Sequence, residues 1–326
     1  MSKAIRIHEH GGPETLRWDE VETGAPDTGQ VLIRQTAAGL NFIDVYHRVG
    51  LYPVASLPAI IGNEGAGVVE VVGDGVTSVQ VGDRVAYCMS FGSYTERRVV
   101  DADRLVKLPD GITDYQAAAM MLKGCTVQYL VKTIYPITSG DTILLHAAAG
   151  GVGLIACQWA KHLGATVIGT VGSDEKAELA RAHGCDHTIV YTRENIVERV
   201  KALTDGAGVP VVYDSVGKDT FIASLDCLQP RGLMVSYGNA SGPVDPFSPG
   251  LLAVRGSLFL TRPTLASYIG TRDELDASAA DLFGVVESGA VKIAVSQTFP
   301  LEDAAQAHRA LEARETTGST VLTIGD

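Results

Sequence analysis

The part of the chain best equipped for chemistry is the run Ala-Ala-Ala-Gly-Gly-Val-Gly at residues 147–153. An apolar stretch, residues 142–146, precedes it, and a segment with apolar side chains at helical spacing, residues 152–162, follows it. This order predicts a buried strand, a tight turn and a helix, whose free N–H groups and positive dipole end attract an anion. Gly150 lets the backbone approach phosphates, and Gly153 lets the helix pack close to the strand. The run therefore indicates a site for the pyrophosphate of a dinucleotide.

The match to the dinucleotide-binding fingerprint is incomplete, because Ala148 stands where that fingerprint has its first glycine. Such a pattern often arises by chance in a plain strand–helix turn, so the interpretation depends on the strand before it and the helix after it. The loop residues that we assign to the cofactor are Ala149, Gly150, Gly151, Val152 and Gly153.

Composition and charge exclude several classes of protein. A length of 326 residues predicts two domains. The net charge of −12 argues against nucleic acid or an anionic membrane as the main partner. The sequence has no signal-peptide pattern and no long apolar run, and its five cysteines are scattered without a Cys-x-x-Cys pair. We therefore expect a cytoplasmic protein with buried cysteines, no membrane segment and no clustered zinc site.

The first part of the chain is rich in strand-forming residues separated by glycine turns. We expect strands over residues 3–7, 30–37, 65–72, 84–86 and 93–99. Helices are expected over residues 41–49, from residue 115 onward with Asp114 as the N-cap, and over residues 125–134.

From residue 142 the pattern changes to alternating strands and helices. Strands are expected over residues 142–146, 166–171, 187–190, 209–214, 233–237 and 257–260, and helices over residues 152–162, 174–183, 195–203, 221–227 and 250–254. Strands alternating with helices predict a doubly wound parallel sheet. The tail differs, with helices expected over residues 272–288 and 301–314 and strands over residues 294–299 and 319–324, and we expect it to return to the first domain.

Further motifs extend over the whole chain. The run Gly-Asn-Glu-Gly-Ala-Gly at residues 62–67 is followed by Gly73 and by Val-Gly-Asp-Arg-Val at residues 81–85. This pattern resembles the signature of the medium-chain dehydrogenase/reductase superfamily. The segments that resemble its NADPH quinone oxidoreductase branch, the ζ-crystallin-like enzymes, are residues 39–44, 51–53, 122–124, 147–153, 212–217 and 231–235.

The resemblance implies an α/β fold with two domains. A Rossmann-type doubly wound sheet would bind the dinucleotide over residues 125–261, and a β-rich GroES-like catalytic domain would comprise residues 1–124 and 262–326.

The resemblance also bears on metal binding. Alcohol dehydrogenases of this superfamily hold a catalytic zinc ion with a cysteine at the start of the first catalytic loop and a histidine in a Gly-His-Glu segment. Here Asn41 stands near the first position and Asn63 replaces the histidine, and an amide oxygen is a poor zinc ligand. We interpret His47 and His146 as packed or surface side chains rather than substitute ligands. We therefore expect no metal, and a substrate that is already electrophilic, such as a quinone or an enone.

The end of the second expected strand indicates which dinucleotide binds. It carries Gly172 and Ser173 rather than the carboxylate that binds the ribose 2′-OH in NAD-selective sites. Lys176 follows within one helical turn, and Tyr191 ends the next strand. These four residues resemble the family's pocket for the 2′-phosphate, which needs a cation, so we predict NADPH.

Two acidic neighbours, Asp174 and Glu175, argue against this prediction unless they point away from the pocket. Acidic residues also suit a helix N-terminus, which is another reason for their presence here. The alternative for Lys176 is a solvated position on the helix face.

The remaining site residues follow from the resemblance. Asn41 would bond a substrate carbonyl or the nicotinamide ribose, and tyrosine rings suit an aromatic substrate. For Asp44 the alternative is a helix cap, and for Tyr46 a place in the core. The catalytic residues implied are Asn41, Asp44, Tyr46, Tyr52, Lys123 and Thr126. The further cofactor-binding residues implied are Phe42, Tyr129, Ser215, Tyr237, Gly238, Asn239, Arg262, Pro263 and Arg314.

The sequence thus predicts an NADPH:quinone oxidoreductase without a metal. The nearest alternative is an NADPH-dependent reductase of alkenal, enone or enoyl-thioester double bonds, although residues 243–249 offer no basic wall for a thioester carrier. An alternative of another class is a crystallin-like or RNA-binding protein, and the net charge of −12 disfavours RNA. The resemblance implies a homodimer, for which the expected strand at residues 257–260 is a candidate edge.

Overall fold

The computed structural model describes residues 1–325, which form two compact units. The first unit comprises Met1–Cys125, Ile269–Glu287 and the chain from Ile293 onward, and the second comprises Thr126–Tyr268 and Ser288–Lys292. Residues 262–268 and 288–292, which we expected in the first domain, group with the second unit, where Tyr268 stacks on Tyr129 with ring centroids 4.3 Å apart. In the described part of the chain, no helix is long and apolar enough to cross a bilayer.

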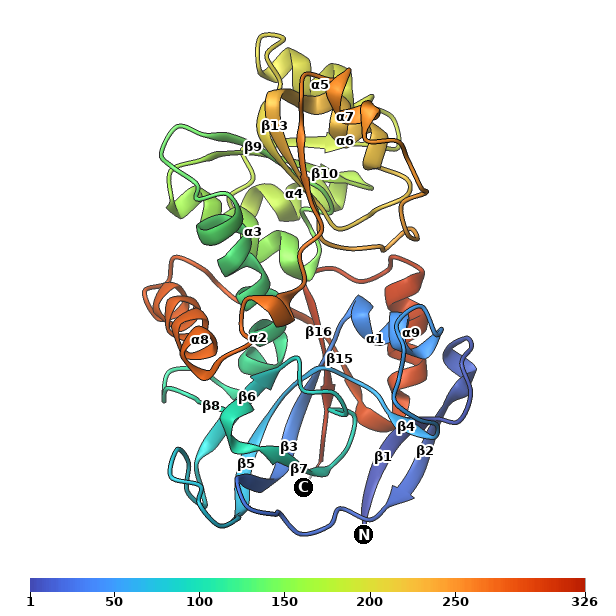
Figure 1. Ribbon diagram of the computed structural model, residues 1–326, viewed down its shortest axis with the longest axis vertical. Coiled ribbons are helices and arrows are strands. Elements are labelled where there is room, and N and C mark those ends of the chain that lie inside the picture. Colours follow the sequence, from blue (N-terminus) through green and yellow to red (C-terminus); the bar gives the residue numbers. More distant parts are fainter. Residues whose placement is uncertain (326) are drawn as a thin grey trace. The chain divides into compact units, whose positions relative to one another are not determined.

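The second unit is built on a parallel sheet of six strands in the order β11-β10-β9-β12-β13-β14. Figure 1 labels β9, β10 and β13 of this sheet. The chain first builds outward from β9 on one side and then adds β12 and its successors on the other, which is the expected doubly wound topology. The strands are β9 (Thr142–Leu145), β10 (Thr166–Val171), β11 (His187–Val190), β12 (Val209–Asp214), β13 (Leu228–Ser236) and β14 (Phe259–Thr261).

Helices pack against this sheet as the alternating pattern predicts. They are α3 (Gly151–His162), α4 (Asp174–Ala182), α5 (Ile196–Leu203), α6 (Phe221–Cys227) and α7 (Gly250–Ala253). Helices α3 and α4 contact β10, whereas α5 and α6 form an apolar cluster with strand residues that include Leu144, Ile168 and Met234. The last strand begins at Phe259 rather than at Ser257, because Ser257 has a φ of 59°, which a strand does not accommodate.

The first unit contains two sheets. A three-stranded sheet has the order β2-β1-β4, and a seven-stranded sheet has the order β15-β16-β3-β5-β6-β8 with β7 paired to β3. Because β16 pairs antiparallel with β3, the C-terminal tail returns to the β-rich part of the chain, as expected. The strands are β1 (Ser2–Ile7), β2 (Leu16–Val21), β3 (Gln30–Leu40), β4 (Ala59–Ile60), β5 (Glu64–Val72), β6 (Arg84–Cys88), β7 (Arg97–Asp101), β8 (Val106–Lys107), β15 (Val295–Pro300) and β16 (Ser319–Thr323).

The helices of the first unit are α1 (Phe42–Arg48), α8 (Arg272–Glu287) and α9 (Ala304–Glu312). Helix α2 (Asp114–Tyr129) begins in the first unit and ends in the second. Short 3-10 turns cover Pro13–Thr15, Ala102–Arg104, Leu265–Ser267 and Leu301–Asp303, and a π turn covers Leu130–Ile134.

Two sequence predictions around α2 are wrong. The cap is Thr113, whose hydroxyl accepts from the N–H of Gln116 at 3.2 Å while the Gln116 side chain accepts from the N–H of Thr113 at 3.0 Å. This is a capping box. Asp114 instead accepts hydrogen bonds from Arg84 (2.7 Å) and Thr36 (2.8 Å). The two helices that we expected are one, which continues to Tyr129 and then into the π turn.

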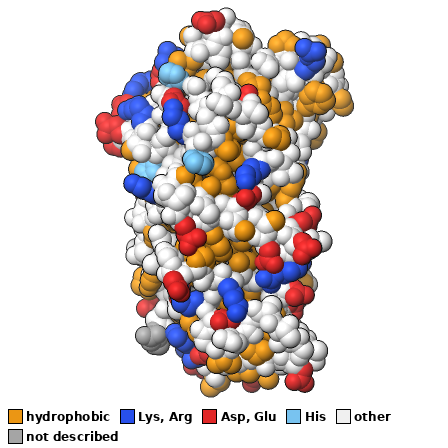
Figure 2. All heavy atoms as spheres, turned by 90° about the vertical axis from the view of Figure 1, so that its left-hand side faces the viewer, with side chains coloured by type: hydrophobic (Ala, Val, Ile, Leu, Met, Phe, Trp, Pro, Cys, Tyr) orange, Lys and Arg blue, Asp and Glu red, His pale blue; other side chains and the backbone are white. Residues whose placement is uncertain are grey.

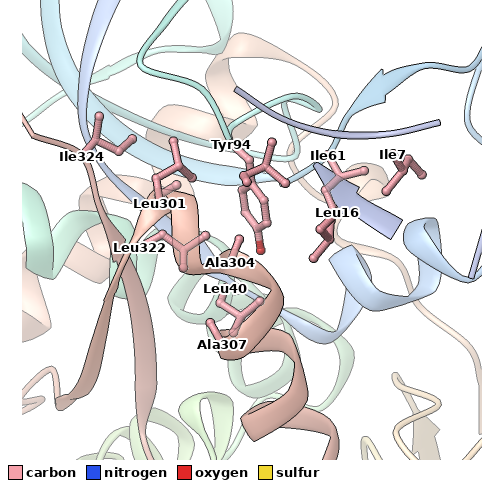
Figure 3. Packing of buried hydrophobic residues seen from close by; sticks show 12 residues of the cluster. Ile7, Leu16, Leu40, Ile61, Tyr94, Leu301, Ala304, Ala307, Leu322 and Ile324 are labelled. Atoms are coloured by element: carbon pink, nitrogen blue, oxygen red, sulfur yellow. The ribbon is translucent and has the colours of Figure 1, made fainter. Parts of the chain in front are cut away.

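An apolar cluster in the first unit surrounds Tyr94 (Figure 3). Leu40 at the end of β3, Leu301, and Ala304 on α9 lie around the ring (Figure 3). The ring is fully buried, so its hydroxyl needs a partner inside the protein. That requirement connects the core to the candidate site.

Candidate functional site

The glycine-rich turn after β9 has the backbone that a phosphate requires. Gly150 is the N-cap of α3 and makes no side-chain cap, so the first N–H groups of the helix are left to a ligand or to water. A Cβ on Gly153 would lie 2.3 Å from the Ala147 carbonyl oxygen and 2.6 Å from the Ala148 carbonyl. Only glycine fits there. The predicted loop Ala149–Val152 thus opens a helix whose backbone is the kind that cradles a pyrophosphate.

Buried polar side chains join the strand ends around this turn. Nδ1 of His146 lies 2.9 Å from Oγ1 of Thr170, and Nε2 lies 2.9 Å from Oγ of Ser224. Ser224 in turn donates to Asp214 at 2.8 Å. Burial lowers the pKa of His146, although the charge of Asp214 opposes the effect. Both ring nitrogens are engaged, so the His146 ring links β10 to α6 and, through Ser224, reaches Asp214 at the end of β12. It is the packed side chain that we expected.

The tips of β10 and β11 form one corner of the second unit. A Cβ on Gly172 would lie 2.9 Å from the hydroxyl of Tyr191, so the glycine makes room for that side chain. Ser173 caps α4 by accepting from the N–H of Lys176 at 3.3 Å. The structure therefore brings together the four residues that we predicted for a 2′-phosphate. Asp174 is engaged in an ion pair with Arg193, whose Nη1 lies 2.7 Å from Oδ2.

Six further predicted residues follow the ends of β12, β13 and β14: Ser215, Tyr237, Gly238, Asn239, Arg262 and Pro263. A Cβ on Gly238 would lie 2.4 Å from the carbonyl oxygen of Ser215, which brings these two strand ends into contact. The Asn239 amide, oriented by its partners, donates to Gly238 O at 3.0 Å and accepts from Arg262 Nη2 at 3.2 Å. Arg262 also donates to the carbonyl of Pro263 at 3.2 Å.

A group of tyrosines lies in the same unit. Tyr129 stacks on Tyr268 with planes 9° apart. Burial and the neighbouring hydroxyls of Tyr237 and Tyr268 raise the pKa of Tyr129, which also hydrogen-bonds Thr126. The N–H of Tyr237 donates to the carbonyl of Asp214 at 2.8 Å. Thr126, Tyr129 and Tyr237 therefore occupy one neighbourhood, which also includes Tyr268, a residue that we did not predict.

In the first unit, Glu64 organises two of the predicted catalytic residues. It is fully buried, and its Oε2 accepts from Asn41 Nδ2 at 2.8 Å and from Lys123 Nζ at 3.1 Å. Its Oε1 accepts from the N–H of Leu122 at 2.7 Å. Gly39 makes the room, since a Cβ there would lie 2.3 Å from Oε2. Asn41 and Lys123 therefore meet at one buried carboxylate.

Asp44 is also fully buried, and three donors surround its carboxylate. They are the N–H of Asn41 (2.9 Å), the amide of Asn63 (2.9 Å) and the hydroxyl of Tyr94 (3.0 Å). The first of these bonds is the helix cap that we named as an alternative. Burial raises the pKa of Asp44 to about 7, although these hydrogen bonds and the charge of Lys123 oppose the effect.

The hydrogen bonds continue from Tyr94 toward the surface. Its hydroxyl lies 3.2 Å from Nε2 of His308, and Nδ1 of His308 lies 3.1 Å from Nη1 of Arg48. Arginine only donates, so Nδ1 accepts and Nε2 carries the proton. Burial and the charge of Arg48 lower the pKa of His308 to about 3, which keeps the ring neutral. Nη2 of Arg48 donates to Oε1 of Glu312 at 2.7 Å, so this ion pair joins helices α1 and α9.

Aromatic rings cluster on α1. Tyr46 is 8% exposed, and its ring centroid lies 6.3 Å from that of Phe42 and 5.2 Å from that of Tyr52. The alternative that Tyr46 belongs to the core therefore agrees with its burial. Tyr52 is half-buried. Arg314 lies apart from these rings in sequence, just after α9, where it is exposed with a φ of 59°.

Several side chains of these networks were not among the predicted residues. Glu64 had a signal, since it lies in the motif at residues 62–67. Tyr94, His308, Arg193 and Tyr268 had none, because each acts through a contact with a distant part of the chain.

The side chains at the positions of the zinc ligands do not fit a zinc ion. Asn41 and Asn63 turn their amide N–H groups toward the carboxylates of Glu64 and Asp44, and the ammonium of Lys123 already lies against Glu64. Within residues 1–325, no three His, Cys, Asp or Glu side chains are grouped so that they could hold a metal ion.

The β-rich unit and the Rossmann-type sheet with its glycine-rich turn define a dehydrogenase/reductase of two domains, and comparisons with known proteins agree. Residues 151–283 match the family described as zinc-binding dehydrogenase, and residues 27–110 match the alcohol dehydrogenase GroES-like domain. A quinone oxidoreductase of Pseudomonas aeruginosa is 56% identical over 323 residues, 99% of either chain. A 2-haloacrylate reductase of a Burkholderia species is 49% identical over 329 residues, again 99% of either chain.

A solved structure agrees as well. The crystal structure of Escherichia coli quinone oxidoreductase complexed with NADPH is similar with a TM-score of 0.96 at 48% identity, covering 98% of this chain and 99% of that one. The chain therefore belongs to the quinone oxidoreductase family of the medium-chain dehydrogenase/reductase superfamily. The expected α/β fold, with a GroES-like domain and a Rossmann-type domain, is confirmed.

Proposed function

We propose that this protein is an NADPH:quinone oxidoreductase that works without a metal ion. The observation that carries the cofactor assignment is the corner of Gly172, Ser173, Lys176 and Tyr191, which offers space, two hydroxyls and a cation at the end of the second strand. A 2′-phosphate is a dianion that such a corner accepts. The names of the relatives support both assignments: quinone oxidoreductase for the Pseudomonas protein supports the substrate, and the complex of the Escherichia coli protein with NADPH supports the cofactor.

The residues of the second unit would hold the cofactor, which supplies a hydride when bound. We assign the pyrophosphate to the helix N-terminus after Gly150. We assign the nicotinamide side to the strand ends at Ser215, Gly238 and Asn239. The remaining cofactor contacts that we propose are Tyr129, Tyr237, Arg262 and Pro263, with Phe42 and Arg314 from the first unit.

The residues of the first unit would orient the substrate and shelter the transfer from water. Tyr46 and Tyr52 present aromatic faces to a flat ring. Lys123, fixed by Glu64, would direct an N–H donor toward the quinone oxygen on which negative charge develops. The amide N–H groups of Asn41 already donate to Glu64 and Gly39, so Asn41 would offer its Oδ1 to a hydroxyl such as that of the nicotinamide ribose. A quinone anion delocalises its charge over the ring, so no metal is required. Asp44 would position Asn41 through the helix cap, and we place Thr126 at the substrate side with Lys123.

Domain roles, assembly and location complete the proposal. The GroES-like unit would be catalytic, and the Rossmann-type unit would bind the cofactor. The edge strand β14, where Phe259 is 62% exposed, would pair in a homodimer. The five free cysteines suit the reducing cytoplasm. On the face drawn in Figure 2, Lys and Arg side chains lie among Asp and Glu rather than in one basic field, which disfavours the RNA-binding alternative.

A second candidate is an NADPH-dependent reductase of electron-poor double bonds. The relative named 2-haloacrylate reductase favours it, because both reactions deliver hydride to a carbonyl-conjugated acceptor and neither needs a metal.

NADPH oxidation, followed by absorbance against a panel of acceptors, tests the proposal. The panel is 1,2-naphthoquinone, 9,10-phenanthrenequinone, an alkenal, 2-chloroacrylate and an enoyl thioester, with NADH as a parallel donor and a zinc chelator as a parallel condition. We expect turnover of the ortho-quinones with NADPH, little with NADH and no effect of the chelator. Turnover restricted to the alkenal, acrylate or thioester would replace the first candidate with the second.

A further inference from the structure

The corner that we assign to the 2′-phosphate contains a residue of the wrong charge. Asp174 is the first residue of α4, directly after the cap Ser173 and the end of β10. Asp174 lies beyond the strand tip at which NAD-selective sites carry their carboxylate, but its negative charge in this corner would still repel the 2′-phosphate of NADP. A site for NADPH therefore needs some means of neutralising Asp174.

The structure supplies that means in Arg193. Its guanidinium faces the carboxylate with two contacts, Nη1 to Oδ2 at 2.7 Å and Nη2 to Oδ1 at 2.5 Å. The pair lowers the pKa of Asp174 through this hydrogen bond and the charge of Arg193, so the carboxylate remains ionised. The planar fork of arginine makes the arrangement specific.

Stability does not account for this pair. The two side chains are 56% and 64% exposed, and exposed ion pairs contribute little to folding. Arg193 comes from the turn after β11, two residues beyond Tyr191. That turn also contacts the tip of β10, since the Thr192 hydroxyl donates to the Gly172 carbonyl at 3.4 Å. The pair therefore lies in the 2′-phosphate corner itself.

The other charged side chains near this corner, those of Glu175, Arg181 and Glu194, each have hydrogen-bond partners other than Asp174 and Arg193. Glu175 hydrogen-bonds Ser173, which lowers the pKa of its carboxyl. Arg181 donates to the Thr188 hydroxyl at 2.6 Å. Glu194 accepts from the N–H of Val190 at 2.8 Å and pairs with Arg199. Among the described residues, the hydrogen bond of Arg193 is the largest influence on the pKa of Asp174, which Arg181 also lowers through its charge.

We propose that Arg193 is a specificity-determining residue: by pairing with Asp174 it cancels the carboxylate and lets this corner accept a 2′-phosphate. The inference rests on the proposed NADPH function, and it assigns the preference to a pair of residues rather than to Lys176 alone. Arg193 acts through Asp174, so the effect of removing it depends on whether the carboxylate is present.

A double-mutant cycle tests this coupling. NADPH and NADH binding are measured by fluorescence titration at low and high salt for the wild type, R193Q, D174N and R193Q/D174N. We expect R193Q to weaken NADPH binding about fivefold to tenfold at low salt and to leave NADH binding within about twofold. D174N and the double variant should bind NADPH about as tightly as the wild type, and high salt should reduce the R193Q effect.

The control is R255Q, which removes another partly exposed, ion-paired arginine, one that precedes the opposite edge strand β14. It should leave both affinities unchanged. The inference would be overturned if R193Q bound NADPH with the affinity of the wild type. It would also be overturned if the double variant bound NADPH as weakly as R193Q does. A wild-type protein that binds NADH as tightly as NADPH would instead overturn the proposed cofactor, so the two failures are distinguishable.

Discussion

The buried carboxyl of Asp44 gives a quantitative prediction about stability. Burial raises its pKa from an ordinary 3.8 to about 7, against hydrogen bonds from Asn63, Asn41 and Tyr94. Between these two pH values the folded protein holds a proton that the unfolded chain has lost. The free energy of unfolding therefore falls as pH rises through this window, and the contribution of Asp44 is complete only below about pH 4.

The magnitude follows from the difference between the two pKa values. At about 1.36 kcal/mol per pKa unit, the whole contribution is about 4 kcal/mol. Between pH 5 and pH 8 the loss is about 2.5 kcal/mol, because part of the titration lies below pH 5. Replacement of Asp44 by asparagine removes this group, and the new amide retains an oxygen for the Asn41 and Tyr94 donors.

Two assays check the prediction. Urea unfolding of the wild type and D44N at pH 5 and pH 8 should show a pH effect smaller by about 2.5 kcal/mol in the variant. Infrared spectra should show a protonated buried carboxyl at pH 5 in the wild type, weaker at pH 8 and missing from D44N.

The control is D83N. Burial alone would raise the pKa of Asp83, but the hydrogen bond and charge of Lys107 bring it below 3.8. Its contribution is therefore constant between pH 5 and pH 8, and D83N should keep the wild-type pH dependence. Equal pH dependence in the wild type and D44N, with no carboxyl band that titrates near pH 7, would refute the reasoning.

Three further predictions concern the glycine turn, the cation and the buried ion pair. K176E should lower NADPH affinity more than about tenfold and spare NADH in binding titrations; unchanged NADPH binding would contradict the phosphate assignment. G153A should lower both the melting temperature and the affinity for either dinucleotide, because its Cβ would lie 2.3 Å from the Ala147 carbonyl oxygen. K123M should destabilise the fold by about 3 kcal/mol in urea unfolding, since it leaves Glu64 buried and unpaired. The double variant E64Q/K123M should recover most of that loss, and a double variant as unstable as K123M would argue against the pair.

The sequence by itself determined the parts of this protein that depend on near neighbours in the chain. The glycine turn at residues 147–153 predicts the helix that follows it, α3. The alternation of strand and helix patterns predicts β10, β11 and β12 with the bounds that the structure has. Those signals are periodic or lie within a few residues of the element they specify. Even there, the cap of α2 was assigned to Asp114, because both Thr113 and Asp114 have side chains that can cap. The capping-box spacing of Thr113 and Gln116 was the signal that distinguishes them.

Only the tertiary structure decided how the polar side chains of the sites are paired. Asp44 takes its partners from Asn63 and Tyr94, and Asp174 takes Arg193 from the next strand tip. Each of these three contacts joins residues that are distant in the chain, and such a contact produces no periodic pattern in the sequence. The sequence placed an unfavourable carboxylate beside Lys176, and the packing of two loops against each other neutralised it. The physical reason is that charge pairing depends on distances of about 3 Å, which are set by the fold as a whole.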